Sequence, residues 1–582
     1  MSNSETHIDD TQHAFLVAWG WFAQHIGLIQ KLQALSFKQK QYHHRPQTKV
    51  LEFLVAILAG LQHLQDISRA AHPLDKDQAV AQAWEQPAWA DYSGVSRTLS
   101  GLSWKEVKQI VQVVEQISQP YLDTEVQVLR SQGKRLRLDG DLTGIPVSNT
   151  SRTYPHAAFG HMADDIRLGY QAGVVSLESP TYGRLWLSVA HHPGDTVSCT
   201  QAEALVVAAE AGLKRRPRRR TELLRQRIHA FEQQVAQTGE RWGTQKQAVK
   251  QAKERMAEAE QQVQERKSQL DELEKDYQFR KLQERPTSHL AQARSRLQAA
   301  VKRSNSRASA CKQAQRRLDK TTVQRSHQQS ELAHLSQRLL RFEQDNAANS
   351  EPVEAEFRLD AGFGTYENVA LLIEMGYDLY TKPHSHKVVT ALKRQVDDTT
   401  VWTPVGANAE LVAWPALQLA NCPYPLDVAL ERFYTGRTLK QSALVHFGAQ
   451  RVTEHLLGWF EQYNGRQTIE AGMKESKQVF YLHHLKVRSE PAIALQEAFV
   501  MFAANFIRWA SHWLEVQAQP AENALNVRKL GIKRQVRVAA HVSAQIIRDS
   551  GGRSLKFSEQ SAFAGQILTV AGDHSSPQKA NF

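Results

Sequence analysis

The sequence predicts an α/β protein whose core is preceded by a helical domain and interrupted by a coiled-coil arm and a second, β-rich insertion. Three observations indicate this fold class. Apolar residues have helical spacing up to about residue 130, short stretches after Arg135 alternate apolar and polar residues, and heptads follow Gln201. With 582 residues, the chain is long enough for three or four folded units.

The N-terminal helical domain is predicted from two apolar-periodic stretches, TKVLEFLVAILAGLQHLQDI and GVSRTLSGLSWKEVKQIVQVVEQI. Within the second stretch, Ser96 to Leu102 is short enough for two interpretations. It could be the recognition helix of a helix-turn-helix, or a helix that only packs against its neighbours.

The core begins where the hydrophobic period changes at Arg135. Three strands with a meander connection are expected from LRLDGDLTGIPV, RLGYQAGVVSLES and GRLWLSVAHH. A strand, turn, helix and strand are expected from EAEFRLDAGFGTYENVALLIEMGYDLYTK, and the segments Arg451 to Leu485 and Glu490 to Val516 are expected to be helical. Between these parts, the β-rich segment from Pro383 to Tyr434 offers VVTALK, LVAWPAL and DVALERFY as strands.

The arm is predicted from a heptad pattern that is broken once. Pro286 cannot continue a helix, so the two halves should fold back on each other as an antiparallel coiled-coil hairpin. Each half of about 38 residues would be roughly 55 Å long. The seam residues are Val249, Ala252, Met256, Ala259, Val263, Leu270, Leu273 and Tyr277, then Leu290, Ala293, Leu297 and Ala300, and finally Leu332, Leu335, Leu339 and Phe342.

These elements give the expected domain boundaries. The core is divided into residues 131–205, 351–382 and 435–518. The remaining segments are the helical domain 1–130, the arm 206–350, the β-rich insertion 383–434 and a C-terminal region with a tail, 519–582.

Charge and composition limit the possible partners and location. The net charge is +12, and residues 214–345 contain 31 Lys and Arg against 16 Asp and Glu, so the rest of the chain sums to about −3. A localised basic excess indicates an anionic partner, either nucleic acid or a membrane surface. Three scattered cysteines, no secretory signal and polar residues within the most apolar helix, 492–514, predict a cytoplasmic protein without a membrane span.

Candidate chemistry begins with carboxylates at strand ends. Asp139 and Asp141 lie two residues apart and therefore share one face of a strand, while Asp360 ends a β-run before a glycine-containing turn. A carboxylate at such a position is desolvated unless a cation neutralises it. Each aspartate alone could also simply cap a turn.

A third carboxylate belongs to a helical stripe. Tyr463, Arg466, Glu470 and Lys477 fall within an arc of roughly 60° on a helix. Arg466 and Lys477 could hold phosphates, and Tyr463 could donate its hydroxyl to a backbone oxygen of nucleic acid. Alternatively, the stripe is a solvated face with salt bridges. Two aspartates and a glutamate supply the hard oxygen ligands that Mg²⁺ or Mn²⁺ prefers, enough for two ions.

The same residues carry a family resemblance. Tyr463-x2-Arg466-x3-Glu470-x6-Lys477 resembles the Y-x2-R-x3-E-x6-K signature of DDE transposases of bacterial insertion sequences, in the group called family four. The stretches DLTG and RLDAGFGTYEN are also similar to that group. The resemblance spans Arg135 to about Val516 and leaves out the arm.

The resemblance implies a ribonuclease H-like catalytic core. It implies that Asp141, Asp360 and Glu470 are catalytic and bind two Mg²⁺ or Mn²⁺ ions per site. It favours Asp141 over Asp139 as the first ligand, because the family's aspartate lies two residues before a threonine. Tyr463, Arg466 and Lys477 would contact DNA.

The expected function is metal-dependent cleavage at transposon ends and joining of the 3′-hydroxyl to target DNA. The expected partners are double-stranded DNA, as terminal repeats and target, and a second copy of the chain in a synaptic homodimer. Such a protein would be associated with the nucleoid. The alternatives are a catalytically silent DNA-binding regulator or architectural protein and a structural coiled-coil protein.

Overall fold

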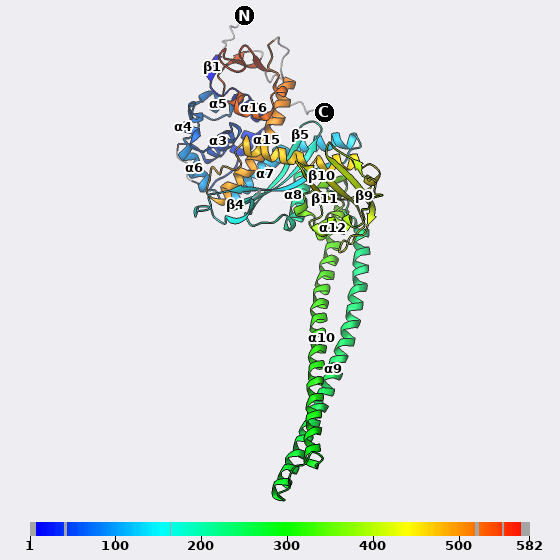
Figure 1. Ribbon diagram of the computed structural model, residues 1–582. Helices are drawn as coiled ribbons and strands as arrows, with labels where there is room; N and C mark the ends of the chain where they lie inside the picture. Colours follow the sequence, from blue (N-terminus) through cyan, green and yellow to red (C-terminus); the bar gives the residue numbers. More distant parts are fainter. Residues whose placement is uncertain (1–6, 40–42, 163–164, 518–522, 550–551, 572–582) are drawn as a thin grey trace. The chain divides into compact units, whose positions relative to one another are not determined.

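The computed structural model describes residues 7–39, 43–162, 165–517, 523–549 and 552–571, and it divides into two units (Figure 1). Unit 1 comprises Met1–Arg218 and Glu351–Phe582, and unit 2 comprises Arg219–Ser350. The helices of unit 1 are α1 (Ala14–His25), α2 (Leu28–Gln33), α3 (Pro46–Leu58), α4 (Asp66–Arg69), α5 (Gln78–Ala83), α6 (Tyr92–Ser100), α7 (Trp104–Ser131), α8 (Ala202–Leu213), α11 (Tyr366–Glu374), α12 (His386–Lys393), α13 (Leu456–Asn464), α14 (Gln467–Gln478), α15 (Glu490–Gln517) and α16 (Ile532–Arg537).

The strands of unit 1 form two sheets. The larger sheet has the order β3-β4-β2-β6-β7-β11-β10-β9-β8, with β5 paired to β4, and the smaller sheet has the order β1-β12-β13-β14. The strands are β1 (His7–Thr11), β2 (Leu136–Pro146), β3 (Ala158–Met162), β4 (Asp165–Ser179), β5 (Gly183–Pro193), β6 (Ala355–Arg358), β7 (Asp378–Thr381), β8 (Thr403–Pro404), β9 (Ala409–Leu417), β10 (Leu426–Thr435), β11 (Thr438–Phe447), β12 (Ala544–Asp549), β13 (Gly552–Phe557) and β14 (Ile567–Ala571).

The centre of the larger sheet is mixed. β2, β4 and β5 form the expected antiparallel meander, and β3 adds a short antiparallel strand to β4. β2, β6 and β7 are parallel neighbours. The predicted strand, turn, helix and strand are confirmed as β6, a short 3₁₀ turn, α11 and β7.

Helices lie on both faces of this part of the sheet. α14 approaches β5 so closely that a Cβ on Gly472 would lie 2.9 Å from the indole of Trp186. On the opposite face, Leu205 of α8 and Leu142 of β2 meet at Gly173 of β4. Because side chains alternate along a strand, Asp139 and Asp141 lie on the α14 face.

The β-rich insertion continues the same sheet, with two corrections to the prediction. VVTALK is not a strand but part of α12, which is capped by Ser385 and buries Val388, Val389 and Leu392 on one side. This one-sided burial has a helical period, which a short apolar run alone does not reveal. β11 lies beyond the expected boundary at residue 434 and pairs with both β10 and β7, so it joins the insertion to the core.

α15 is the expected buried core helix, and three of its polar residues contact β5 or α14. Glu497 lies 2.8 Å from His191 of β5, Asn505 donates to and accepts from the backbone of Trp186, and Arg508 pairs with a carboxylate of α14 at 2.9 Å. None of the helices in the described part of the chain combines the length and apolar character needed to cross a membrane.

The N-terminal region is helical as predicted, but its first described residues form a strand. β1 pairs with β12, so the C-terminal region completes a small sheet with the N-terminal strand. α6 buries Val95 and Leu99 and contacts α3, while Arg97 is exposed. A packing role for this helix is therefore confirmed, and base recognition by its exposed face stays a prediction.

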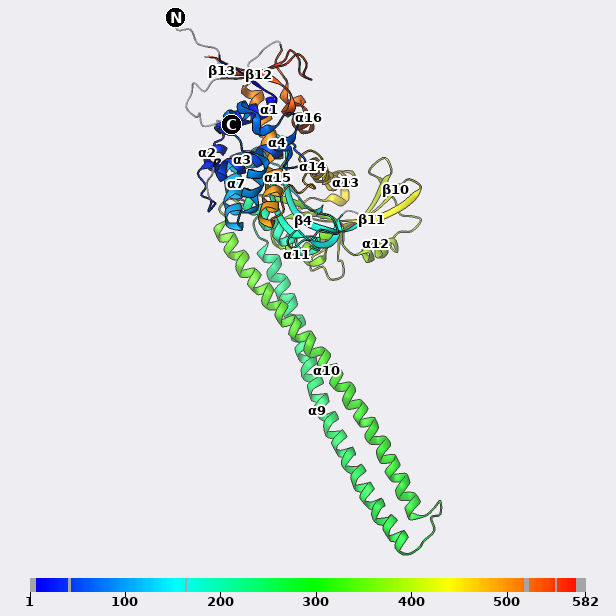
Figure 2. The ribbon, with the colours of Figure 1, turned by 90° about the vertical axis from the view of Figure 1, so that its left-hand side faces the viewer.

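Unit 2 is the predicted antiparallel hairpin and is longer than expected. Figure 2 shows α9 (Thr221–Phe279) and α10 (His289–Ala348) side by side, joined by the segment that contains Pro286. The helices have 59 and 60 residues, each about 90 Å long, because the seam already begins at Leu224 and Ile228. The boundary also moves from 206 to 219, since α8 packs on β4 and β5 in unit 1.

Removal of the arm should leave the remainder folded. Within unit 1, the backbone N–H of Val353 donates to the carbonyl of Arg216 at 3.2 Å, so the chain ends left by excising 219–350 already lie close together. A variant with a short Gly/Ser linker in place of these residues should stay soluble and unfold cooperatively, with less helical signal in circular dichroism. An insoluble variant would contradict this expectation.

Candidate functional site

The site begins with the register of two parallel strands. β2 and β6 pair so that Asp139 lies opposite Arg358. Two residues further along each strand are Asp141 and Asp360, and Asp360 still has an extended backbone, with φ −80° and ψ 178°. Residues two apart share a face of a strand. The register that pairs Asp139 with Arg358 therefore also brings Asp141 and Asp360 to the same face, just beyond the end of β6.

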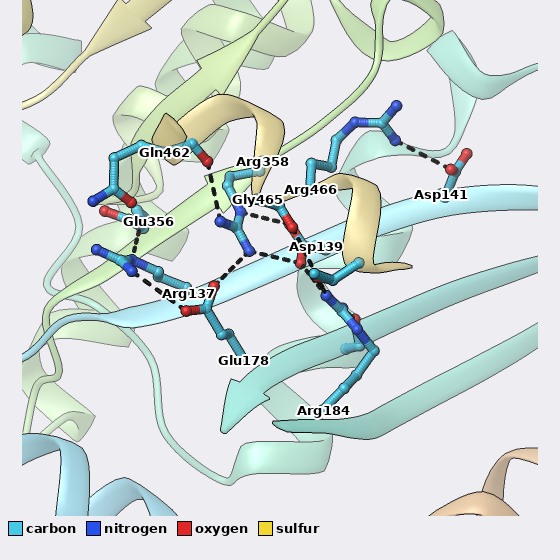
Figure 3. Close-up of polar contacts among 12 residues, drawn as sticks. Arg137, Asp139, Asp141, Glu178, Arg184, Glu356, Arg358, Gln462, Gly465 and Arg466 are labelled. Atoms are coloured by element: carbon cyan, nitrogen blue, oxygen red, sulfur yellow. Dashed lines mark hydrogen bonds and ion pairs between the residues drawn. The ribbon is translucent and has the colours of Figure 1, made fainter. Parts of the chain in front are cut away.

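Asp139 is held in a buried ion-pair network (Figure 3). Its carboxylate is 0% exposed and accepts from Arg358 Nε at 2.7 Å and from Arg358 Nη2 at 2.9 Å. Arg184 Nη2 lies 3.0 Å from the same carboxylate. A carboxylate neutralised by two arginines has a structural role, which leaves Asp141 as the functional candidate on β2.

The same two arginines also hold the ends of α13 and α14, which carry the signature residues, against the sheet. Arg358 Nη1 donates to the carbonyl of Gln462 at 3.1 Å, and Arg184 donates to the hydroxyl of Thr468. A Cβ on Gly465 would lie 2.5 Å from Arg358 Nη1, so the junction between α13 and α14 approaches the guanidinium too closely for a side chain.

The helix expected from Arg451 to Leu485 is broken at this junction. α13 ends at Asn464, α14 begins at Gln467, and α14 ends at Gln478. The linking residues form tight turns, in which the N–H of Arg466 donates to Tyr463 and that of Ile469 donates to Arg466. These turns place Gly465 against Arg358 and separate α13 from α14. The four signature residues therefore do not lie on one straight helix.

Arg466 joins two of the three candidate carboxylates. Its Nη1 lies 3.2 Å from Asp141 Oδ2, and its Nη2 lies 2.9 Å from Glu470 Oε1. Burial and the nearby charge of Asp360 raise the pKa of Asp141 to about 7, which Arg466 and a backbone hydrogen bond from Leu142 only partly counteract. The site therefore crowds carboxylates, and their repulsion is relieved by a proton on Asp141 or by a cation.

The other signature residues occupy different environments. Tyr463 is buried with Trp459 in an apolar cluster against β9 to β11, and burial raises its pKa to about 12. Lys477 is half-buried, burial lowers its pKa and the charge of Asp141 opposes that shift. The charges of Arg466 and Lys477 thus act on Asp141, whereas Tyr463 packs in the apolar cluster. A contact between Tyr463 and DNA stays a prediction.

The donors fit a divalent metal in chemistry, but not in their present arrangement. Asp141, Asp360 and Glu470 offer hard carboxylate oxygens, and the charges of the other two raise the pKa of Asp141. Asp360, however, accepts from the N–H of Gly362 at 2.9 Å, and Arg466 lies between the other two. Within the described ranges, no group of three or more His, Cys, Asp or Glu is placed to hold a metal ion.

Comparison with known proteins gives no assignment. No protein family model matches the chain, and no curated protein is significantly similar to it in sequence. A functional conclusion must therefore be built on the residues of the site.

Arg358 and Arg184 are the residues that sequence reasoning missed. A signal for Arg358 was present, because it lies two residues before Asp360, as Asp139 lies two residues before Asp141. Charged residues at matching positions of two buried strands indicate an ion pair if the strands are neighbours. Arg184 carries no comparable signal, because its pairing depends on how β5 is placed.

Loss of Arg358 should destabilise unit 1. Arg358→Met leaves the carboxylate of Asp139 with one arginine instead of two, and breaking a buried pair costs about 3–5 kcal/mol. Urea unfolding should show this loss in the free energy of unfolding. Arg451→Met is the matched control, because that side chain is 82% exposed and should matter by less than about 0.5 kcal/mol. Equal effects would contradict the role of the network.

The raised pKa of Asp141 predicts pH-dependent stability. The folded protein keeps this proton up to about pH 7, whereas the unfolded chain loses it near the ordinary value of 3.8, so the folded state binds more protons in between. The free energy of unfolding should therefore fall as the pH rises from about 4 to about 7 and then level off. In urea titrations, Asp141→Asn should reduce the fall in the free energy of unfolding between about pH 4 and about pH 7. An unchanged fall would show that Asp141 is not its cause.

Proposed function

We propose that this protein is a DDE transposase of a bacterial insertion sequence, which cleaves phosphodiester bonds at transposon ends and joins the 3′-hydroxyl to target DNA. One observation carries the proposal. Asp141 lies on β2, Asp360 lies two residues beyond the end of the adjacent parallel strand β6, and Glu470 of α14 is joined to Asp141 through Arg466. Three carboxylates from separate parts of the sequence thus influence one another, because the charges of Asp360 and Glu470 both act on Asp141.

The architecture of unit 1 supports a ribonuclease H-like core. In the order β5-β4-β2-β6-β7, only β4 runs against the others, and helices cover both faces. Asp141 of β2 and Asp360 both lie just beyond the point where β6 ends, so they are suitably placed to act on a ligand bound there.

Each residue then has a chemical role. Asp141, Asp360 and Glu470 would hold the metal, and Mg²⁺ or Mn²⁺, two per site, would act as Lewis acid and activate the attacking water or 3′-hydroxyl. Arg466 has a forked guanidinium that can exchange a carboxylate for a phosphate, and Lys477 adds a point charge beside it. Tyr463 anchors α13 in the apolar cluster and so fixes the start of α14.

The substrate would be double-stranded DNA. Pairing two transposon ends requires at least a homodimer, and the basic arm and N-terminal helices would add largely sequence-independent phosphate contacts. Nucleoid association follows from this function.

A catalytically silent regulator is the second candidate, and the Arg466 bridges favour it. Arg466 satisfies Asp141 and Glu470 without a metal. A protein that only binds DNA could keep this arrangement permanently.

A plasmid cleavage assay with Mg²⁺ or Mn²⁺ separates the two candidates. Glu470→Gln and Asp360→Ala should each reduce nicking by about two orders of magnitude or more, since each would remove a metal ligand. Glu461→Gln is the matched control, because this exposed glutamate on α13 is outside the site. DNA binding without cleavage by the unmodified protein would support the regulator instead.

A further inference from the structure

The two long helices of unit 2 have two flanks beside their apolar seam. Arg225–Glu343 and Arg294–Glu274 are ion pairs of 2.6 and 2.8 Å on one flank. Arg227–Glu331, at 3.9 Å, lies on the other. In an antiparallel pair with seven-residue periodicity, positions seven apart stay on the same flank, so each flank can be followed along both helices from these pairs.

The flank that begins with Arg227 and Glu331 is dominated by arginine. Steps of seven from Arg227 along α9 and from Glu331 back along α10 define its members. Its middle positions are Gln234, Arg241, Ala248, Arg255 and Gln262 on α9, and Gln324, Arg317, Ala310, Arg303 and Arg296 on α10. We call Arg241, Arg255, Arg296, Arg303 and Arg317 the arginine flank. No acidic residue occupies any of these ten positions.

The members of the arginine flank are exposed, and none of the five forms an ion pair with another described residue. Flank positions of paired helices usually carry opposite charges, which stabilise the pair. Like charges in this place repel and cost stability. The arginines are therefore poorly explained by the folding of the hairpin itself and are better explained by an anionic partner.

The dimensions of the flank suit a nucleic-acid duplex. Arg296 and Arg317 are 21 residues apart, or roughly 32 Å, close to one turn of B-DNA at about 34 Å. The outer side of α9 repels a polyanion, because it carries exposed glutamates. These glutamates are Glu240, Glu254, Glu258, Glu265 and Glu272.

The residue types also distinguish between possible polyanions. The middle of the flank has no large apolar side chain that could insert into a lipid surface. Arginine guanidinium groups bind phosphate oxygens in a bidentate manner, and a row about one turn long meets phosphates of both strands along one side of a duplex.

We propose that the arginine flank of the arm binds the phosphate backbone of duplex DNA lengthwise, independently of base sequence. The choice of DNA rests on the proposed function, whereas the binding surface rests on the arm alone. Such a contact would hold a segment of DNA about one helical turn long.

The test compares two full-length variants that each lose four positive charges. Binding of a random-sequence duplex of about three helical turns is measured by fluorescence anisotropy in EDTA, over roughly 50 to 200 mM salt. The flank variant is Arg241→Gln, Arg255→Gln, Arg303→Gln and Arg317→Gln. The control variant changes exposed lysines of α9: Lys250→Gln, Lys253→Gln, Lys267→Gln and Lys275→Gln.

The flank variant should lower the slope of log affinity against log salt by about 3 to 4, and the control by less than about 1. Equal changes in both would mean that net charge rather than the flank matters, and no change in the flank variant would exclude the contact; either overturns the proposal. Tighter flank-dependent binding of duplex RNA would overturn the choice of DNA.

Two further points keep the result interpretable. Circular dichroism shows whether the helices of each variant are intact. If the flank variant with four substitutions unfolds, the double variant Arg303→Gln with Arg317→Gln should lower the slope of log affinity against log salt by about 2. Because EDTA removes metal, failure here leaves the cleavage proposal untouched, and failure of cleavage leaves the flank untouched.

Discussion

The structure of unit 1 depends on the buried ion pair between Asp139 and Arg358. The pair connects β2 to the last residue of β6 and so marks the register in which the two strands pair. A slip of one residue would turn Asp141 to the opposite face of the sheet. Burying these charges is tolerable only because each finds several partners, Arg184 for the aspartate and the Gln462 carbonyl for the arginine.

The same network determines what surrounds Asp141. Because its arginines also hold the junction before α14, Arg466 reaches Asp141 and links it to Glu470, although more than 300 residues separate both from Asp141 in the sequence. Crowded carboxylates in a partly buried site raise the pKa of Asp141, and Arg466 offsets part of that repulsion. Relief of the repulsion between these carboxylates is therefore the physical requirement of this site, whether a proton, arginine or a metal supplies it.

The two units separate these electrostatic tasks. Unit 1 concentrates a few acidic groups beyond the end of β6, while unit 2 spreads basic groups along two helices. The arginine flank arises from the heptad itself, because a repeat of seven that buries one seam also aligns the residues beside it. The seven-residue repeat thus aligns the arginines along the arm into a surface about one DNA turn long.

Local periodicity and spacing determined much of this protein by themselves: the strands β2, β4 and β5, the arm with its turn near Pro286, the buried α15, and Asp139, Asp141, Asp360 and Glu470 as candidate carboxylates. These features depend on neighbours in the sequence. Tertiary structure alone decided that VVTALK is helical, that β11 joins the insertion to the core, that Asp139 is structural, and that Arg466 bridges two carboxylates. Each of these depends on which distant segment lies alongside, because the free energy of burying a charge or an apolar face is set by its partner and not by its own sequence.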